Sequence, residues 1–169
     1  MKGDEVGMII YTDGSAHPNP GPGGFGVIVL DNDEKILYNY NKQFVKEEVT
    51  NNEMELKAIL YSFLNYGVNI NNDNSFLIDI PIVYSDSNYC VQTFNNWMFN
   101  WAKNNWIKSD NKPPENLELI KVYYDWYQKG YRIDLRKVKG HSTNKWNNLV
   151  DLLATGKISS EEIYKQYGN

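Results

Sequence analysis

The sequence has few of the features that mark secreted, membrane-bound or thiol-based proteins. It holds one cysteine, Cys90, which excludes a disulfide framework and a thiolate metal site. No apolar run is long enough to span a membrane, and the charged residues 1–5 do not resemble a signal peptide. We therefore expect a cytoplasmic protein, and its 169 residues suffice for one domain with a single core.

Positive charge is also scarce. The chain has 17 Lys and Arg against 21 Asp and Glu, which argues against a protein that binds nucleic acid over its whole surface. The distribution is uneven, since residues 1–96 hold 5 basic and 13 acidic residues whereas residues 97–169 hold 12 and 8. An acidic first half beside a basic second half indicates cation binding in one place and phosphate binding in another.

A strand followed by an acid stands near the start of the chain. Residues 7–12 are apolar, β-branched and aromatic, which favours a buried central strand that ends at Asp13. The Gly- and Pro-rich stretch 16–24 is expected to be a loop. Open α/β sheets place ligands at the carboxyl ends of such strands, although an Asp–Gly pair alone is more often a surface turn.

Three more acids occupy comparable settings. Asp86 follows an apolar strand expected over residues 80–84 and precedes Ser87, a suitable helix cap. Glu55 lies in the first turn of a helix that a Thr50–Glu53 capping box should start. Asp151 falls between apolar neighbours of the last expected helix. Each acid taken alone has an ordinary explanation as a turn, cap or helix-surface residue.

The other elements alternate strands and helices, as in an α/β domain. We expect strands over residues 25–30, 35–44 and 131–138, and helices over 50–66, 87–94, 116–128 and 144–156. Trp97 and Trp101 are four residues apart, so they lie on one face of a helix. With the lysines that follow them they fit a track for single-stranded nucleic acid, although core packing explains a single Trp equally simply.

Four carboxylates brought together in such a fold would repel one another and could not all stay ionised without a counter-charge. Divalent cations supply that charge, and all-oxygen ligands select hard ions such as Mg²⁺. Two ions at such a site can activate a water and stabilise a leaving oxyanion in phosphodiester cleavage.

The motifs together resemble type 1 ribonuclease H over roughly residues 8–154. The matching segments are Tyr-Thr-Asp-Gly-Ser at 11–15, Asn-Pro-Gly-Pro-Gly-Gly-Phe-Gly at 19–26, Thr-Asn-Asn-Glu-Met-Glu-Leu at 50–56, Tyr-Ser-Asp-Ser-Asn-Tyr at 84–89, Lys-Pro at 112–113 with Asn116, Val-Lys-Gly-His at 138–141, and Asn147 with Asp151. The resemblance implies an α/β, ribonuclease H-like fold with a five-stranded mixed sheet flanked by helices on both faces. It also implies one catalytic domain over 1–169, with a core of about 8–155 and a tail, 156–169, that the resemblance does not place.

The resemblance implies a role for each matching residue. The metal ligands would be Asp13, Glu55, Asp86 and Asp151, holding two Mg²⁺ ions that Mn²⁺ can replace. His141 would assist product release or proton transfer from a mobile loop.

It implies a substrate-binding set as well. Thr50 and Asn116 would hold a DNA phosphate, Trp97 and Trp101 would line the DNA channel, and four asparagines would line the RNA strand, namely Asn19, Asn51, Asn52 and Asn88. The implied activity is endonucleolytic hydrolysis of the RNA strand of RNA–DNA hybrids by a monomer, with recognition of the RNA 2′-hydroxyl. Two alternatives stay open: a non-catalytic hybrid-binding module, and a DNA nuclease or integrase of the same fold.

Overall fold

The computed structural model describes residues 7–72, 79–138 and 144–168. A five-stranded mixed sheet forms the centre, in the order β3-β2-β1-β5-β7. Its strands are β1 (Ile9–Ala16), β2 (Gly21–Leu30), β3 (Ile36–Val49), β5 (Ile82–Ser85) and β7 (Asp134–Lys137). The first three strands form an antiparallel meander, and β5 and β7 run parallel to β1. The predicted five-stranded mixed sheet is confirmed.

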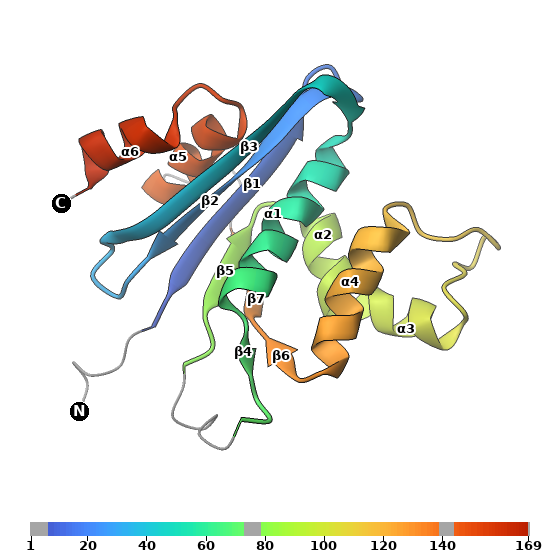
Figure 1. Ribbon diagram of the computed structural model, residues 1–169. Coiled ribbons are helices and arrows are strands. Elements are labelled where there is room, and N and C mark those ends of the chain that lie inside the picture. The colour runs from blue at the N-terminus through green and yellow to red at the C-terminus, as the bar shows by residue number, and fades with distance from the viewer. Residues whose placement is uncertain (1–6, 73–78, 139–143, 169) are drawn as a thin grey trace.

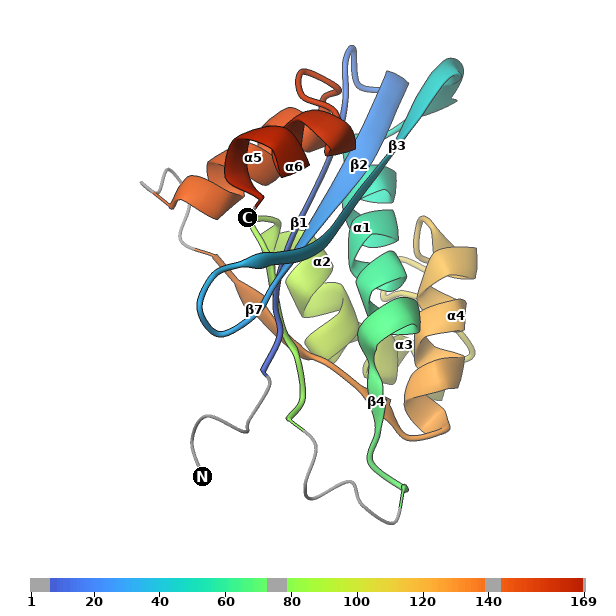
Figure 2. The same cartoon turned by 60° about the vertical axis from the view of Figure 1, so that its left-hand side comes forward.

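Helices cover both faces of this sheet (Figures 1 and 2). One face carries α1 (Asn51–Tyr66), α2 (Asn88–Gln92), a π-helical turn (Thr93–Trp97), α3 (Met98–Lys103) and α4 (Leu117–Gln128). The other face carries α5 (Lys145–Ala154) and α6 (Ser160–Tyr167). A separate two-stranded sheet joins β4 (Val68–Asn69) to β6 (Tyr131–Arg132).

The alternation of side chains along β1 and β2 produces two cores, one on each face. Ile10 and Val27 belong to the core beneath α1, whereas their neighbours Tyr11 and Ile28 belong to the core beneath α5. All four side chains are buried. Residues 9–11 are therefore apolar without alternation, because both faces of the central strand are covered.

The structure corrects the predicted end of the first strand. β1 continues past Asp13 to Ala16, and β2 begins at Gly21, so only residues 17–20 lie between the two strands. Antiparallel pairing runs as far as Ala16 and Gly23. A Cβ at Gly23 would lie 2.7 Å from Val49 Cγ2, so glycine here permits close strand packing rather than a loop.

Other boundaries also differ from the sequence prediction. The helix predicted over 87–94 is capped by Ser87, whose Oγ accepts from Cys90 N at 3.2 Å, but it continues as a π-turn into α3. The single strand predicted over 131–138 is divided between the two sheets, as β6 and β7. A long predicted strand can split in this way because each part pairs with a different neighbour.

The tail forms a helix, α6, against the edge strand β3. Ser159 starts this helix with a capping box to Glu162. Within the helix, the Ile163 side chain is fully buried. Asn39 N of β3 donates to Tyr164 Oη at 3.1 Å. Among the residues that the structure describes, no helix is long and apolar enough to cross a membrane.

Candidate active site

Asp13 lies where β1 separates from β5. The parallel pairing of these strands ends at Tyr11 and Tyr84, while β1 continues alongside β2. The Asp13 side chain is only 5% exposed, and its Oδ1 accepts from Gly14 N at 2.9 Å. A carboxylate is thus buried at the opening between two central strands.

Gly14 determines how closely α1 approaches this point. A Cβ at Gly14 would lie 2.5 Å from Glu55 N, so no larger residue fits without moving α1. The first turn of α1 therefore packs directly on the β1 backbone, and Glu55 is buried beside Asp13. Thr50 fixes the start of the helix by accepting from Glu53 N at 3.1 Å, which confirms half of the predicted capping box, while the Glu53 carboxylate pairs with Lys57 at 3.4 Å.

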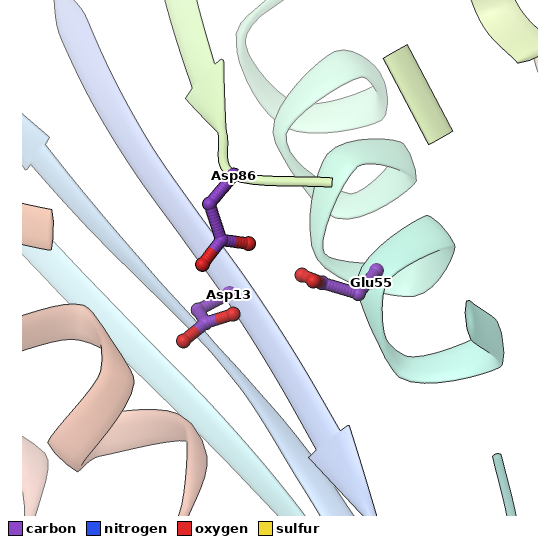
Figure 3. Close-up of side chains that lie close together, drawn as sticks. All are labelled: Asp13, Glu55 and Asp86. Atoms are coloured by element: carbon purple, nitrogen blue, oxygen red, sulfur yellow. The ribbon is translucent and has the colours of Figure 1, made fainter. Parts of the chain in front are cut away.

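Asp86 is the residue that follows β5. Ser85 is fully buried, and its Oγ accepts from Ser87 N at 3.1 Å in the turn that carries Asp86. One carboxylate oxygen from each of Asp13, Glu55 and Asp86 lies within 4.8 Å of the others. Figure 3 shows these three side chains pointing toward one another from β1, α1 and the turn after β5.

Asp151 adjoins this cluster from the opposite side of the sheet. It lies on α5 and is exposed, unlike Asp13 and Glu55. Its carboxylate is close enough to raise the pKa of Asp13, both by a hydrogen bond and by its charge. The structure therefore brings three predicted acids into one group and places the fourth beside Asp13.

The surroundings of the cluster disfavour the ionised forms of Asp13 and Glu55. Burial, then the charge of Asp86 and the contacts with Asp151, raise the pKa of Asp13 to about 8. Burial, followed by the charges of Asp13 and Asp86, raises the pKa of Glu55 well above its ordinary value. Glu55 Oε1 is also buried and has no hydrogen-bond partner among the described residues. A hard cation coordinated by oxygen would relieve both the repulsion and this unpaired atom, so the residues fit a divalent metal.

The sequence as a whole matches known proteins of one family. The RNase H family model matches residues 5–159. A ribonuclease H from Caldanaerobacter subterraneus subsp. tengcongensis is 40% identical over 164 residues, covering 94% of this chain and 95% of its own. The chain belongs to the ribonuclease H family. A ribonuclease H from Rickettsia bellii is 36% identical over 174 residues, covering 99% of this chain and 100% of its own.

Solved ribonuclease H structures share the fold. The solution structure of the PFV RNase H domain is 18% identical, covers 98% of this chain and 99% of its own, and has a TM-score of 0.67. LC11-RNase H1, solved in complex with an RNA/DNA hybrid, is 22% identical, covers 87% of this chain and 93% of its own, and has a TM-score of 0.59. The fold predicted from the ribonuclease H resemblance is therefore confirmed.

His141, the histidine expected from the ribonuclease H resemblance, lies outside the described residues. The described residues on either side are fixed to the central strands, because Val138 N donates to Ser85 O at 2.8 Å and Asn144 Nδ2 donates to Tyr11 Oη at 3.0 Å. Asn144 also caps α5, accepting from Asn147 N at 3.1 Å. The role of His141 stays a prediction.

Three residues of the predicted ribonuclease H substrate set gather at the N-terminal end of α1. Asn51 Oδ1 accepts from Ala16 N at 2.6 Å, and Asn51 N donates to Asn19 Oδ1 at 3.0 Å. These bonds tie the β1–β2 turn to the helix that starts after Thr50. Part of this set therefore shapes the site, and its contact with a substrate stays a prediction.

The other members of the set lie at the starts of α1 and α2, in the helical segment 93–103 and just before α4. Asn52 and Asn88 are exposed at the first turns of α1 and α2. The Trp97 ring is 37% exposed and lies 6.2 Å from the partly buried Trp101 ring, as helical neighbours should. Asn116 precedes α4 with a left-handed φ of 60°. Their contribution to binding stays a prediction.

Gly14 is a determinant of the site that was not predicted from the sequence. It was expected in a turn after the strand, whereas it lies within β1 under the first turn of α1. Its neighbours offered a clue, because a glycine directly after a strand acid is also the residue that allows another backbone to approach closely.

Proposed function

We propose that this chain hydrolyses the RNA strand of RNA–DNA hybrids at the carboxylate cluster, with two Mg²⁺ ions held by Asp13, Glu55, Asp86 and Asp151. The observation that carries the proposal is the grouping of Asp13, Glu55 and Asp86 oxygens within 4.8 Å, with raised pKa values for the two buried acids. Family membership supports it, since its relatives carry the name ribonuclease H.

The carboxylates hold the cations and fix where the scissile phosphate can sit. Bound Mg²⁺ would lower the pKa of a water and offset the charge on the phosphate oxygens. Asp13 and Glu55 are buried, so their geometry is set by β1 and α1. Asp86 and Asp151 are more exposed, so we assign them to the side of the site that meets substrate and solvent.

The surface around the cluster would bind the two strands differently. We assign Thr50 and Asn116 to a DNA phosphate, and Trp97 and Trp101 to the DNA strand, where aromatic rings stack or pack against the sugar–base edge. The asparagines at the starts of α1 and α2 would meet the RNA strand, where amide groups can read the 2′-hydroxyl. They are Asn51, Asn52 and Asn88, with Asn19 behind Asn51.

His141 would move a proton near the leaving group. An imidazole titrates near neutral pH and can give or accept a proton, which suits a group beside a departing oxyanion. We do not assign it as a metal ligand. In the sequence, His141 falls between β7 and α5, the helix that bears Asp151.

A substrate panel tests the proposal. Purified protein in Mg²⁺ should cut the RNA strand of a labelled RNA–DNA hybrid and leave matched duplex DNA and duplex RNA intact, because only the hybrid offers a 2′-hydroxyl opposite a DNA strand. Equal rates on hybrid and duplex DNA would contradict the assignment of the asparagines. Tight binding of the hybrid without cleavage would instead identify a non-catalytic binding module.

We also propose that the chain acts as a monomer with one catalytic domain over 1–169, and that Mn²⁺ can replace Mg²⁺. Its described helices surround the central five-stranded sheet, which fits a single folding unit (Figure 1). Light scattering after size-exclusion chromatography should give a mass near the 19.7 kDa of one chain.

A further inference from the structure

Two amide side chains of the edge strand β3 reach across the sheet to the last turn of α5. Asn41 Nδ2 donates to Leu153 O at 3.1 Å. Gln43 Nε2 donates to Ala154 O at 3.0 Å and lies 3.4 Å from Leu153 O. The carbonyls at the end of this helix are therefore bound by side chains more than 100 positions earlier in the sequence.

Glycines in β2 leave the space that these contacts need. Asn41 pairs with Gly26 and Gln43 pairs with Gly24 in the β2–β3 register. A Cβ at Gly24 would lie 2.6 Å from Gln43 Cδ, and a Cβ at Gly26 would lie 3.0 Å from Leu153 Cγ. Gly24 therefore leaves room for the Gln43 side chain, and Gly26 leaves room for the last turn of α5 to lie close to β2.

The contacts add to the capping of α5. The last carbonyls of a helix have no partner within the helix, and a basic residue in the last turn often serves them. The last turn of α5 contains no basic residue, and Leu153 O accepts from Gly156 N at 3.2 Å. Asn41 and Gln43 add side-chain donors to Leu153 O and Ala154 O, and these donors attach the helix end to the sheet.

Asp151 lies on the turn that these amides hold. It is two residues before Leu153, which is about 3 Å along the helix axis. Its own carbonyl accepts from Thr155 N at 3.0 Å, so the turn that carries it is continuous with the turn that is bound. Asp151 is exposed, unlike Asp13 and Glu55, so the position of α5 is what keeps its carboxylate beside Asp13.

We propose that Asn41 and Gln43 are positioning residues that hold α5, and with it Asp151, against the carboxylate cluster; this inference rests on the function proposed above for that cluster. The two amides act through Asp151 and touch neither substrate nor metal. Loss of their donors should let the end of α5 move away from β1, which would weaken metal binding without changing the hybrid-binding surface.

The test uses neutral replacements of similar shape in the full chain. The variants are Gln43→Met and the double variant Asn41→Leu/Gln43→Met, which remove the donors without adding charge. The matched control is Asn71→Leu. Asn71 Nδ2 donates to Lys129 O at 3.2 Å at the end of α4, and a Cβ at Gly130 would crowd it, so it makes the same kind of contact to a helix that bears no site acid.

Three measurements are compared for each protein: amide hydrogen exchange without metal, the Mg²⁺-induced rise in melting temperature, and the Mg²⁺ and hybrid dependence of cleavage. For the double variant we expect faster exchange in α5, a smaller Mg²⁺-induced rise, and a half-saturating Mg²⁺ concentration raised on the order of tenfold. The KM for hybrid should stay unchanged. Gln43→Met should show the same changes to a smaller extent, and Asn71→Leu should show none of them in α5.

Unchanged α5 exchange or an unchanged Mg²⁺ requirement in the double variant would overturn the inference, as would an equal shift in Asn71→Leu. In an Asp151→Asn background, the double variant should no longer alter the Mg²⁺-induced rise; a full further loss there would also overturn it. Exchange and melting do not depend on cleavage, so a wild-type protein that binds Mg²⁺ but fails to cut hybrid would contradict the proposed function alone.

Discussion

At the scale of single residues, the carboxylate cluster destabilises the folded protein when no metal is bound. Asp13 and Glu55 are buried beside each other and beside Asp86, and the pKa of each is raised. In the absence of a cation the folded protein therefore keeps protons that the unfolded chain would release. The site is arranged for a bound cation at some cost to stability without it.

Without metal, Asp13→Asn should be more stable than wild type, and the difference should grow as pH rises. The pKa of Asp13 is about 8 in the fold against an ordinary value of 3.8, so wild-type stability falls as pH rises from about 4 to about 8. The amide cannot ionise, so the variant should escape this fall. At about 1.4 kcal/mol per pKa unit, we expect its advantage to grow to several kcal/mol at the upper end.

Urea unfolding in a chelator at several pH values measures this difference. Asp125→Asn is the matched control, because Asp125 is an exposed acid of α4. Its stability relative to wild type should change little over the same range. A variant Asp13→Asn that loses stability in parallel with wild type would show that the cluster does not carry the repulsion assigned to it.

His141→Ala should slow turnover without abolishing it. A positioned acid–base group contributes on the order of 10²-fold, and the metal-holding acids are unchanged in this variant. The Mg²⁺ dependence should therefore remain close to that of wild type, whereas Asp13→Asn should lose cleavage altogether. Steady-state rates on one hybrid distinguish the roles: full activity would make His141 dispensable, and complete inactivity would give it a larger role.

At the scale of secondary-structure elements, the sequence predicted where acids would meet but not the geometry that brings them together. The apolar run before Asp13 and the Thr50 cap of α1 are local signals, and the structure contains both. The extension of β1 to Ala16 depends on pairing with Gly23, which is not local. Stretch 16–24 was predicted as a loop because Gly and Pro disfavour strands in isolation. Residues 17–20 do lie between the strands, whereas Ala16 and residues 21–24 are held in strands by pairing among β1, β2 and β3.

Gly14→Ala should separate α1 from β1. The new Cβ would lie 2.5 Å from Glu55 N, a backbone atom that cannot rotate away. We expect a loss of roughly 1–3 kcal/mol in the free energy of unfolding, together with weaker Mg²⁺-induced stabilisation because Glu55 moves. Gly7→Ala is the control, since its nearest neighbour is the end of the Asn32 side chain.

Thermal melts with and without Mg²⁺ are sufficient for this comparison. Gly7→Ala should retain the full Mg²⁺ response, because the Asn32 side chain can move and no site acid shifts. An undiminished Mg²⁺ response in Gly14→Ala would mean that the approach of α1 to β1 does not set the position of Glu55.

At the scale of the whole molecule, the order and spacing of motifs predicted the family and the sheet, and both are confirmed. The tail was the part left unplaced. Its helix begins with Ser159 and Glu162, a capping-box pattern that is readable from sequence, but its docking on β3 depends on contacts with Asn39, over 100 residues earlier. Distant packing of this kind has no signature in a single sequence.

If the carboxylate cluster makes this chain a metal-dependent ribonuclease H, cleavage must require both Mg²⁺ and the Asp13 carboxylate. Cleavage of the RNA strand of a labelled hybrid is followed against Mg²⁺ concentration for wild type and for Asp13→Asn, with circular dichroism to show that both are folded. Wild type should show saturable, Mg²⁺-dependent cleavage, and the variant should show none. Near-normal cleavage by Asp13→Asn, or wild-type cleavage that persists in a chelator, would contradict it.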